Sequence, residues 1–171
     1  MKRALSALCC VFVFVVPALA QNAAPMSDQK FLETAAQTDM VEVNLGNLAQ
    51  DAASSQAVKD YGQMLARDHT QDFQALQSLA QQTGLAMPTA IDTDHNKAMV
   101  GPMHALKGSA FDHKYIENMI AGHTQAIALY KKEAQTATNP ALKAYAQQTL
   151  PTLQKHLDAA KAIQQGKTPA M

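Results

Sequence analysis

The helical spacing of apolar residues constrains the fold of this chain most strongly. Within residues 55–82, one stripe with steps of three and four residues contains Val58, Gly62, Leu65, Leu76 and Leu79. This spacing places the stripe on one face of an α-helix, where it is expected to be buried. His69 and Asp72 occupy the two positions that continue the stripe, so this helix brings an imidazole and a carboxylate to its buried face.

The same periodicity predicts four long helices, over residues 27–53, 55–82, 110–136 and 139–165. Ser27 is a favourable N-cap, Gly84 and Pro88 follow the second helix, and Pro140 suits the first turn of the fourth. Valine and isoleucine runs typical of strands are missing after the first twenty residues. The predicted fold class is all-α, a four-helix bundle.

The two predicted hairpins resemble each other at a constant shift of 84 residues. The sequence DQKFLE, from Asp28, aligns with DHKYIE, from Asp112, and AVKDYGQ aligns with ALKAYAQ. This agreement indicates a duplicated helical hairpin. About 27 residues separate the hairpins, enough to run the length of the bundle with a short helix over residues 93–106 bent at Gly101 and Pro102. The prediction is therefore a ferritin-like bundle with a long crossover between the second and third helices, and the alternative is an up-down bundle with a disordered loop.

Residues 1–20 are predicted to be a signal peptide, and residues 21–171 a single domain. Lys2 and Arg3 precede an apolar run that ends in the small-residue sequence PALAQ, which predicts cleavage near Ala20 and a periplasmic or secreted protein. Cys9 and Cys10 both lie in this segment, so no disulfide or thiolate metal site is expected in the mature chain. No later segment is long and apolar enough to be an integral membrane segment.

The net charge of the mature chain argues against a nucleic-acid partner. Without Lys2 and Arg3 the chain has 12 basic and 14 acidic residues. Binding to a nucleic-acid backbone requires a basic surface, so no nucleic-acid partner is expected. A protein partner or a homo-oligomer is left open.

Each predicted helix carries one polar residue on its buried stripe: Glu42, His69, His123 and His156. Residues that face each other in an antiparallel hairpin have numbers that sum to about twice the centre of the turn. By this rule Glu42 lies level with His69, and His123 with His156, near the middle of the bundle. Burial of such groups costs roughly several kcal/mol unless they are hydrogen-bonded, paired or bound to metal.

Two interpretations of this layer are compatible with the residue types. In the first, Glu42, His69, His123 and His156 bind a divalent transition metal, and Asp39, Asp68 and Asp72 accept hydrogen bonds from the other imidazole nitrogens. In the second, the same residues form a metal-free network that fixes helix register. The crossover also contains thioethers and imidazoles, which favour Cu(I), although packing over the core is the simpler interpretation. These residues are Met87, His95, Met99, Met103 and His104.

Four longer motifs occur in order: FLETAAQTDMVEVNLGNLA, LARDHTQDFQALQSLA, GSAFDHKYIENMIAGHTQAIALY and LKAYAQQTLPTLQKHLDAA. Together they resemble the exported bacterial domain of unknown function numbered four-one-four-two. The resemblance implies a ferritin-like four-helix fold in an exported protein, and no activity. The positions that match the family pattern are Glu42, Asp68, His69, Phe111, Asp112, Tyr115, His123, Pro151 and His156.

Comparison with ferritins limits the expected chemistry. Di-iron bundles use Glu-x-x-His motifs on two helices, but Ala66 and Leu153 stand three residues before His69 and His156. A bridged di-iron centre and ferroxidase activity are therefore not expected. No nucleophile or oxyanion arrangement is evident, so no catalytic residue is predicted and enzyme activity is left open. The prediction is an exported metal-binding bundle with a role in metal handling or envelope stress; the alternative is a metal-free structural or protein-interaction module of the periplasm.

Overall fold

The computed structural model describes residues 26–169, and within this range the chain forms helices and no strand. The predicted all-α class is confirmed. The long helices are α1 (Asp28–Ala52), α2 (Gln56–Thr83), α5 (Gly108–Thr136) and α6 (Pro140–Gln164). Their ends lie within two residues of the predicted ends. The predicted signal peptide, residues 1–20, lies outside the described residues, and none of the described helices is long and apolar enough to cross a membrane.

Local chemistry explains where the helices begin and end. The Ser27 side chain accepts a hydrogen bond from the backbone N–H of Lys30, and Asn139 accepts one from Ala141, so both act as N-caps. Helix α2 ends at Gly84, which has a φ of 71°. This left-handed conformation favours glycine because it has no Cβ.

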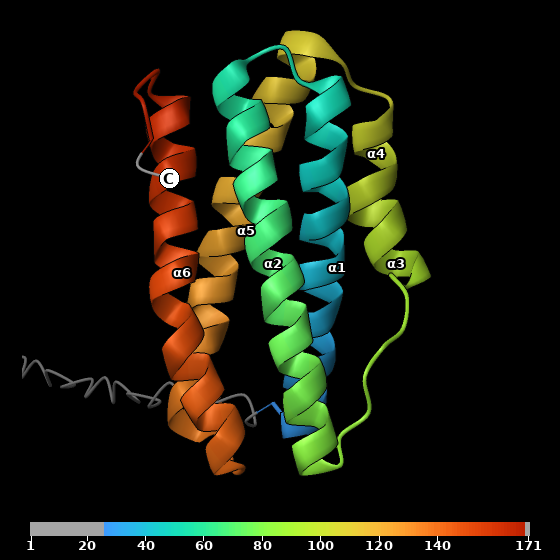
Figure 1. Cartoon of the computed structure of the whole chain (residues 1–171), viewed down its shortest axis with the longest axis vertical. Helices are drawn as coiled ribbons and strands as arrows, with labels where there is room; N and C mark the ends of the chain where they lie inside the picture. The colour runs from blue at the N-terminus through green and yellow to red at the C-terminus, as the bar shows by residue number, and fades with distance from the viewer. Residues whose placement is uncertain (1–25, 170–171) are drawn as a thin grey trace, which may run out of the picture.

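The long helices form two hairpins, α1–α2 and α5–α6 (Figure 1). In the view of Figure 1, α1 runs upward and α2 downward, and the crossover segment (residues 84–107) then returns along α1 to the top. Helix α5 runs downward again and α6 upward, so α2 and α5 run in the same direction. Contacts are far denser within each hairpin than between the hairpins.

The crossover segment is helical in its second half. It contains α3 (Thr93–His95), the π-helical turn η1 (Asn96–Val100) and α4 (Gly101–His104), where a single bent helix was predicted. The bend takes the form of a π-turn, in which the N–H of Gly101 donates to the carbonyl of Asn96, five residues earlier.

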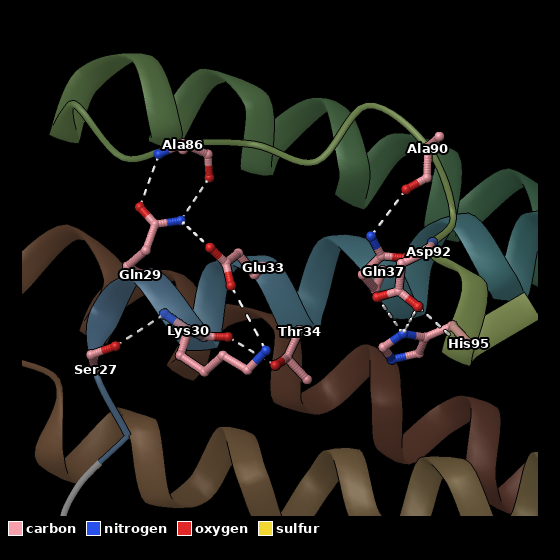
Figure 2. A network of polar contacts seen from close by, with 10 residues as sticks. All are labelled: Ser27, Gln29, Lys30, Glu33, Thr34, Gln37, Ala86, Ala90, Asp92 and His95. Atoms are coloured by element: carbon pink, nitrogen blue, oxygen red, sulfur yellow. Dashed lines mark hydrogen bonds and ion pairs between the residues drawn. The ribbon is translucent and has the colours of Figure 1, made fainter. Parts of the chain in front are cut away.

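Two glutamines of α1 fix the extended half of the crossover segment, as Figure 2 shows. The Gln29 amide donates to the carbonyl of Ala86 and accepts from its N–H, both at 2.9 Å. The Gln37 amide donates to the carbonyl of Ala90 and accepts from the N–H of Asp92, both at 3.0 Å. Each side chain therefore satisfies backbone groups that a loop would otherwise leave to water.

The ends of the two hairpins are joined by equivalent contacts at the 84-residue shift. Asp112 of α5 accepts from the backbone N–H groups of Ser54 and Ser55 in the turn of the first hairpin, at 3.0 and 2.9 Å. Asp28 of α1 accepts from those of Thr138 and Asn139 in the turn of the second, at 3.2 and 2.9 Å. Each hairpin thus supplies the carboxylate that holds the turn of the other.

The apolar core is divided into two clusters along the bundle. One includes Leu45, Leu65 and Met119, and the other includes Phe31 and Leu76. On each long helix, the positions between the two clusters include a polar side chain. These side chains form the candidate site.

Candidate metal centre

Three histidines from three helices meet in the middle of the bundle. His69 of α2, His123 of α5 and His156 of α6 are each at most 3 % exposed. Each offers one ring nitrogen, and these atoms all lie within 4.8 Å of one another. The structure therefore brings together the three imidazoles of the predicted site, at the spacing that a single metal ion needs.

One acceptor holds each ring in place. His69 Nδ1 lies 2.8 Å from Asp39 Oδ1, and His156 Nε2 lies 3.0 Å from Asp68 Oδ2. His123 Nδ1 lies 2.9 Å from the carbonyl oxygen of Met119, one turn earlier on α5. A carbonyl or carboxylate oxygen only accepts, so each of these nitrogens carries the proton. Such acceptors fix both the orientation and the tautomer of an imidazole that binds a metal.

The remaining nitrogens therefore carry lone pairs when the rings are neutral. His123 Nε2 and His156 Nδ1 face each other at 3.3 Å. Two lone pairs at this distance repel each other unless a proton or a cation lies between them. His69 Nε2 is buried and has no hydrogen-bond partner among the described residues. Three ring nitrogens thus converge on one point, and all three are acceptors once His69 has lost its second proton.

The three histidines differ in pKa because their electrostatic surroundings differ. Burial, together with charge on His69, lowers the pKa of His123 to about 3 and that of His156 to about 4. Burial would also lower the pKa of His69, but the hydrogen bond and the negative charge of Asp39, with the charge of Glu42 behind them, raise it to about 9. At neutral pH, His123 and His156 are therefore neutral, and His69 is protonated. Burial also raises the pKa of its partner Asp39, to about 7, so Asp39 is fully ionised only above neutral pH.

Glu42 lies beside this group but is not one of its members. Its side chain is 3 % exposed, and Oε2 has no hydrogen-bond partner among the described residues. The carboxylate lies near Gly122, the residue before His123, because a Cβ added there would be 3.9 Å from Glu42 Oε1. Burial raises the pKa of Glu42. Its role as a ligand stays a prediction.

Of the three aspartates predicted to support the histidines, Asp39 and Asp68 bond to imidazoles. Asp72 accepts instead from the Tyr145 hydroxyl at 2.7 Å, and Tyr145 in turn lies 3.2 Å from the Tyr130 hydroxyl. Sequence reasoning missed this tyrosine pair and the Met119 carbonyl. The repeat offered one signal, since Tyr145 is equivalent to Tyr61, whose hydroxyl donates to the backbone carbonyl of His156 at 3.1 Å. The Met119 carbonyl has no sequence signal, because any helical residue supplies one.

Two clefts lead toward the histidines from opposite sides. One, of about 380 Å³, lies between α2 and α6 and is lined by Asp68, Asp72 and His156. The other, of about 330 Å³, lies between α1 and α5 and is lined by Asp39 and Glu42, with His95 and Met99 of the crossover segment. His69 lines both clefts. A small ion therefore has two routes to the layer.

The model of a protein family, the domain of unknown function DUF4142, matches residues 15–163. The chain belongs to this family. No curated protein sequence matches it. Solved structures of CopM are similar in fold: the Ag-bound form obtained by soaking and the Cu(I)-bound form each have a TM-score of 0.64 and 17 % identity. The Cu(II)-bound form has a TM-score of 0.61 and 16 % identity. These matches cover 82–83 % of this chain and 97 % of the CopM chain, and at this identity they support the fold alone.

Proposed function

We propose that this protein is a periplasmic, ferritin-like bundle that binds one transition-metal ion through His69, His123 and His156 and functions in metal handling. The observation that carries the proposal is the pair of facing acceptors, His123 Nε2 and His156 Nδ1, 3.3 Å apart in the core. Both rings are protonated on their other nitrogen, so neither can donate to the other while neutral. A bound cation satisfies both.

The metal-free network explains these atoms less well. It would need a proton between His123 and His156, yet the pKa values of both rings are lowered, to about 3 and about 4. The extra proton of the layer lies instead on His69 Nε2, which has no hydrogen-bond partner among the described residues. The network would also leave His69 Nε2 and Glu42 Oε2 buried without partners. Each unpaired buried polar atom costs about 1–3 kcal/mol. One ion at this point gives all three imidazoles a partner, with Glu42 as the candidate fourth ligand.

The ligand set favours a borderline ion. Imidazole nitrogens suit Zn²⁺, Cu²⁺ and Ni²⁺, whereas Mg²⁺ and Ca²⁺ prefer sites made of oxygen ligands. Copper is the first ion to test, because the similar CopM structures are described as bound to Cu(I), Cu(II) and Ag. Asp68, whose pKa is lowered by its bonds to His156 and Arg67, places a negative charge beside the site, and the buried Asp39 and Glu42 can ionise when a divalent cation binds.

The chemistry of the site favours storage or transfer of the ion over catalysis. The histidines are buried, which suits holding an ion rather than presenting it to a large substrate. Handling of an ion requires only ligands and a route, and the two clefts supply routes. Protection of the cell envelope during metal stress is the expected physiological setting.

The test is elemental analysis of protein purified from the periplasm, followed by calorimetric titration of stripped protein with Cu²⁺ and Zn²⁺. The parent should bind one equivalent, and a His123→Ala/His156→Ala variant none at the same concentrations. A matched control is His104→Ala/His113→Ala, which removes two exposed histidines and should bind as the parent does.

A second measurement distinguishes loss of the metal site from loss of folding. Saturating metal should raise the melting temperature of the parent and of the control, because an ion that binds only the folded state adds about 2.7 kcal/mol at 100 times its Kd. If the parent carries no metal and its melting temperature ignores copper, zinc and chelators, the proposal fails. The layer is then a structural network in a protein-interaction module.

A further inference from the structure

The mouth of the α1–α5 cleft carries a second pair of metal-binding side chains. His95, at the end of α3, and Met99, in η1, stand four residues apart on the crossover segment, and both line this cleft. Buried atoms without partners, Glu42 Oε2 and His69 Nε2, belong to residues that line the same cleft. The cleft therefore connects an exposed nitrogen and sulfur pair with unsatisfied ligands in the core.

His95 is oriented as a ligand would be. Its Nδ1 lies 2.8 Å from Asp92 Oδ1 and 2.9 Å from Oδ2, and its backbone N–H donates to the same carboxylate at 2.8 Å. The proton is therefore on Nδ1, and Nε2 keeps its lone pair. Figure 2 shows the ring beside Asp92, where the crossover segment turns from extended chain into helix. Half-exposed, with 38 % of its side chain accessible, His95 can take an ion from solvent.

Met99 supplies a soft donor on the same side. It is half-buried at the edge of the first apolar cluster, which leaves part of the thioether accessible. Met103, one turn later, is 1 % exposed and packs in the core, so the packing interpretation holds for that residue. Met99 and Met103 therefore differ in burial, and only Met99 is accessible enough to bind an ion.

The pair is held in place over the cleft. Gln37 bonds to Ala90 and Asp92, and Asp92 in turn bonds His95, so one connected set of hydrogen bonds runs from α1 to the ring. Pre-positioning of this kind lowers the entropy lost when an ion binds. A loop without such bonds would offer the same ligand types at a greater entropic cost.

We infer that His95 Nε2 and Met99 Sδ form an outer site for a soft monovalent ion, Cu(I) or Ag(I), from which the ion enters the α1–α5 cleft toward the histidine layer. An imidazole nitrogen with a thioether sulfur suits these ions, and harder ions gain little from the sulfur. The residues that line the cleft include Thr34, Thr38 and Gln125, which have neutral oxygens, and the buried Asp39, Glu42 and His69. The destination of the ion rests on the proposed function; the outer site does not.

The test uses Ag⁺, which is redox-stable, and four proteins. These are the parent, His95→Ala/Met99→Leu, His123→Ala/His156→Ala, and the control His104→Ala/Met87→Leu, which alters another histidine and methionine of the crossover segment outside this cleft. Leucine keeps the volume of methionine, so packing is preserved. Calorimetry gives the stoichiometry, stopped-flow mixing gives the loading rate, and the ε-methyl NMR resonance of Met99 reports sulfur coordination.

The parent and the control should bind two equivalents of Ag⁺, and the Met99 resonance should shift with one of them. His95→Ala/Met99→Leu should lose that equivalent and load the inner site at least tenfold more slowly. His123→Ala/His156→Ala should keep the outer equivalent. If the His95/Met99 variant matches the control in stoichiometry and rate, and the Met99 resonance does not respond, the inference is overturned. A parent that binds Ag⁺ only at His95 and Met99 would uphold the outer site and contradict the proposed function.

Discussion

The two hairpins of this bundle make equivalent contacts at their ends but carry different residues in the middle of the bundle. At the ends, Asp28 and Asp112 make matching bonds to the turn of the other hairpin. In the middle, the equivalents of Asp39 and Asp72 at the 84-residue shift are His123 and His156. The ends serve the fold, which both hairpins need in the same form. The middle is where a duplicated structure can acquire different ligands without changing its helices.

This difference gives the layer both of its components. Carboxylates come from α1 and α2, and two of the three imidazoles from α5 and α6. Asp68 of the first hairpin is thereby paired with His156 of the second, whereas Asp39 pairs with His69 within the first hairpin. Two identical middles would place only carboxylates or only imidazoles at these positions, and buried like charges repel.

The hairpins also differ at the positions of two glycines. In the first, a Cβ added to Gly46 would lie 2.4 Å from the Gly62 carbonyl oxygen, a contact that no side chain can relieve. The equivalents of these glycines in the second hairpin are Tyr130 and Ala146. Close approach of α1 and α2 accompanies the direct contact of Asp39 with His69, whereas the second hairpin has the buried Tyr130 side chain at the position equivalent to Gly46.

Substitution of Gly46 should have the largest effect of the changes considered. Gly46→Ala forces the backbones of α1 and α2 apart, which costs about 3 kcal/mol or more before a gain of about 1 kcal/mol in helix propensity. The free energy of unfolding from urea denaturation should fall by roughly 2–3 kcal/mol. Gly122→Ala is the matched control: its added Cβ would meet only Glu42 Oε1, at 3.9 Å, so the same propensity should leave stability equal or higher. Equal effects of the two substitutions would mean that the close approach is not needed.

Much of this architecture was predictable, for identifiable reasons. Apolar spacing predicted the helices, because one buried face per helix is a local property of the sequence. The level of the histidines followed from hairpin geometry, since antiparallel neighbours pair by position number. The partner of Asp112 was not predictable: near the start of a helix an aspartate is expected to stabilise its own helix, yet Asp112, in the second turn of α5, accepts hydrogen bonds from a residue 58 positions away. The tautomers and the facing lone pairs depend on side-chain rotamers, which periodicity does not specify.

The asymmetry of the layer predicts how metal binding depends on pH. Between about pH 7 and pH 9, His123 and His156 are neutral, Asp39, with a pKa raised to about 7, is ionised, and the proton is on His69, whose pKa is raised to about 9 by its bond to Asp39. A metal must displace this proton, so affinity should rise about tenfold per pH unit up to pH 9 and then level off. Protons released by a buried Glu42 would act in the same direction. Competition titrations with a chromophoric chelator at pH 6.5, 7.5 and 8.5 measure the slope.

Asp39→Asn provides the control for this dependence. The amide keeps the shape of the side chain but removes the charge that raises the pKa of His69, so the pH dependence should level off at a lower pH. Affinity above pH 9 should fall as well, by about 10–100-fold, the usual effect of losing an acceptor behind a ligand. An affinity that does not change with pH in the parent would contradict the assignment of the proton to His69.

The smallest expected effect on stability comes from removing the two aspartates that hold the hairpin turns. Asp28→Ala and Asp112→Ala each remove a carboxylate that accepts from two backbone N–H groups and one hydroxyl of a turn. Loss of such a cap costs about 1–2 kcal/mol. The two variants should lose the same free energy of unfolding within about 0.5 kcal/mol, and the double variant should lose their sum, because the sites lie at opposite ends of the bundle. Asp51→Ala, at an exposed position of α1, should change stability by less than about 0.5 kcal/mol. If the two losses of unfolding free energy differ by more than about 1 kcal/mol, the hairpins differ at their ends as well as in the middle of the bundle. Equivalent hydrogen bonds would then contribute unequally to stability.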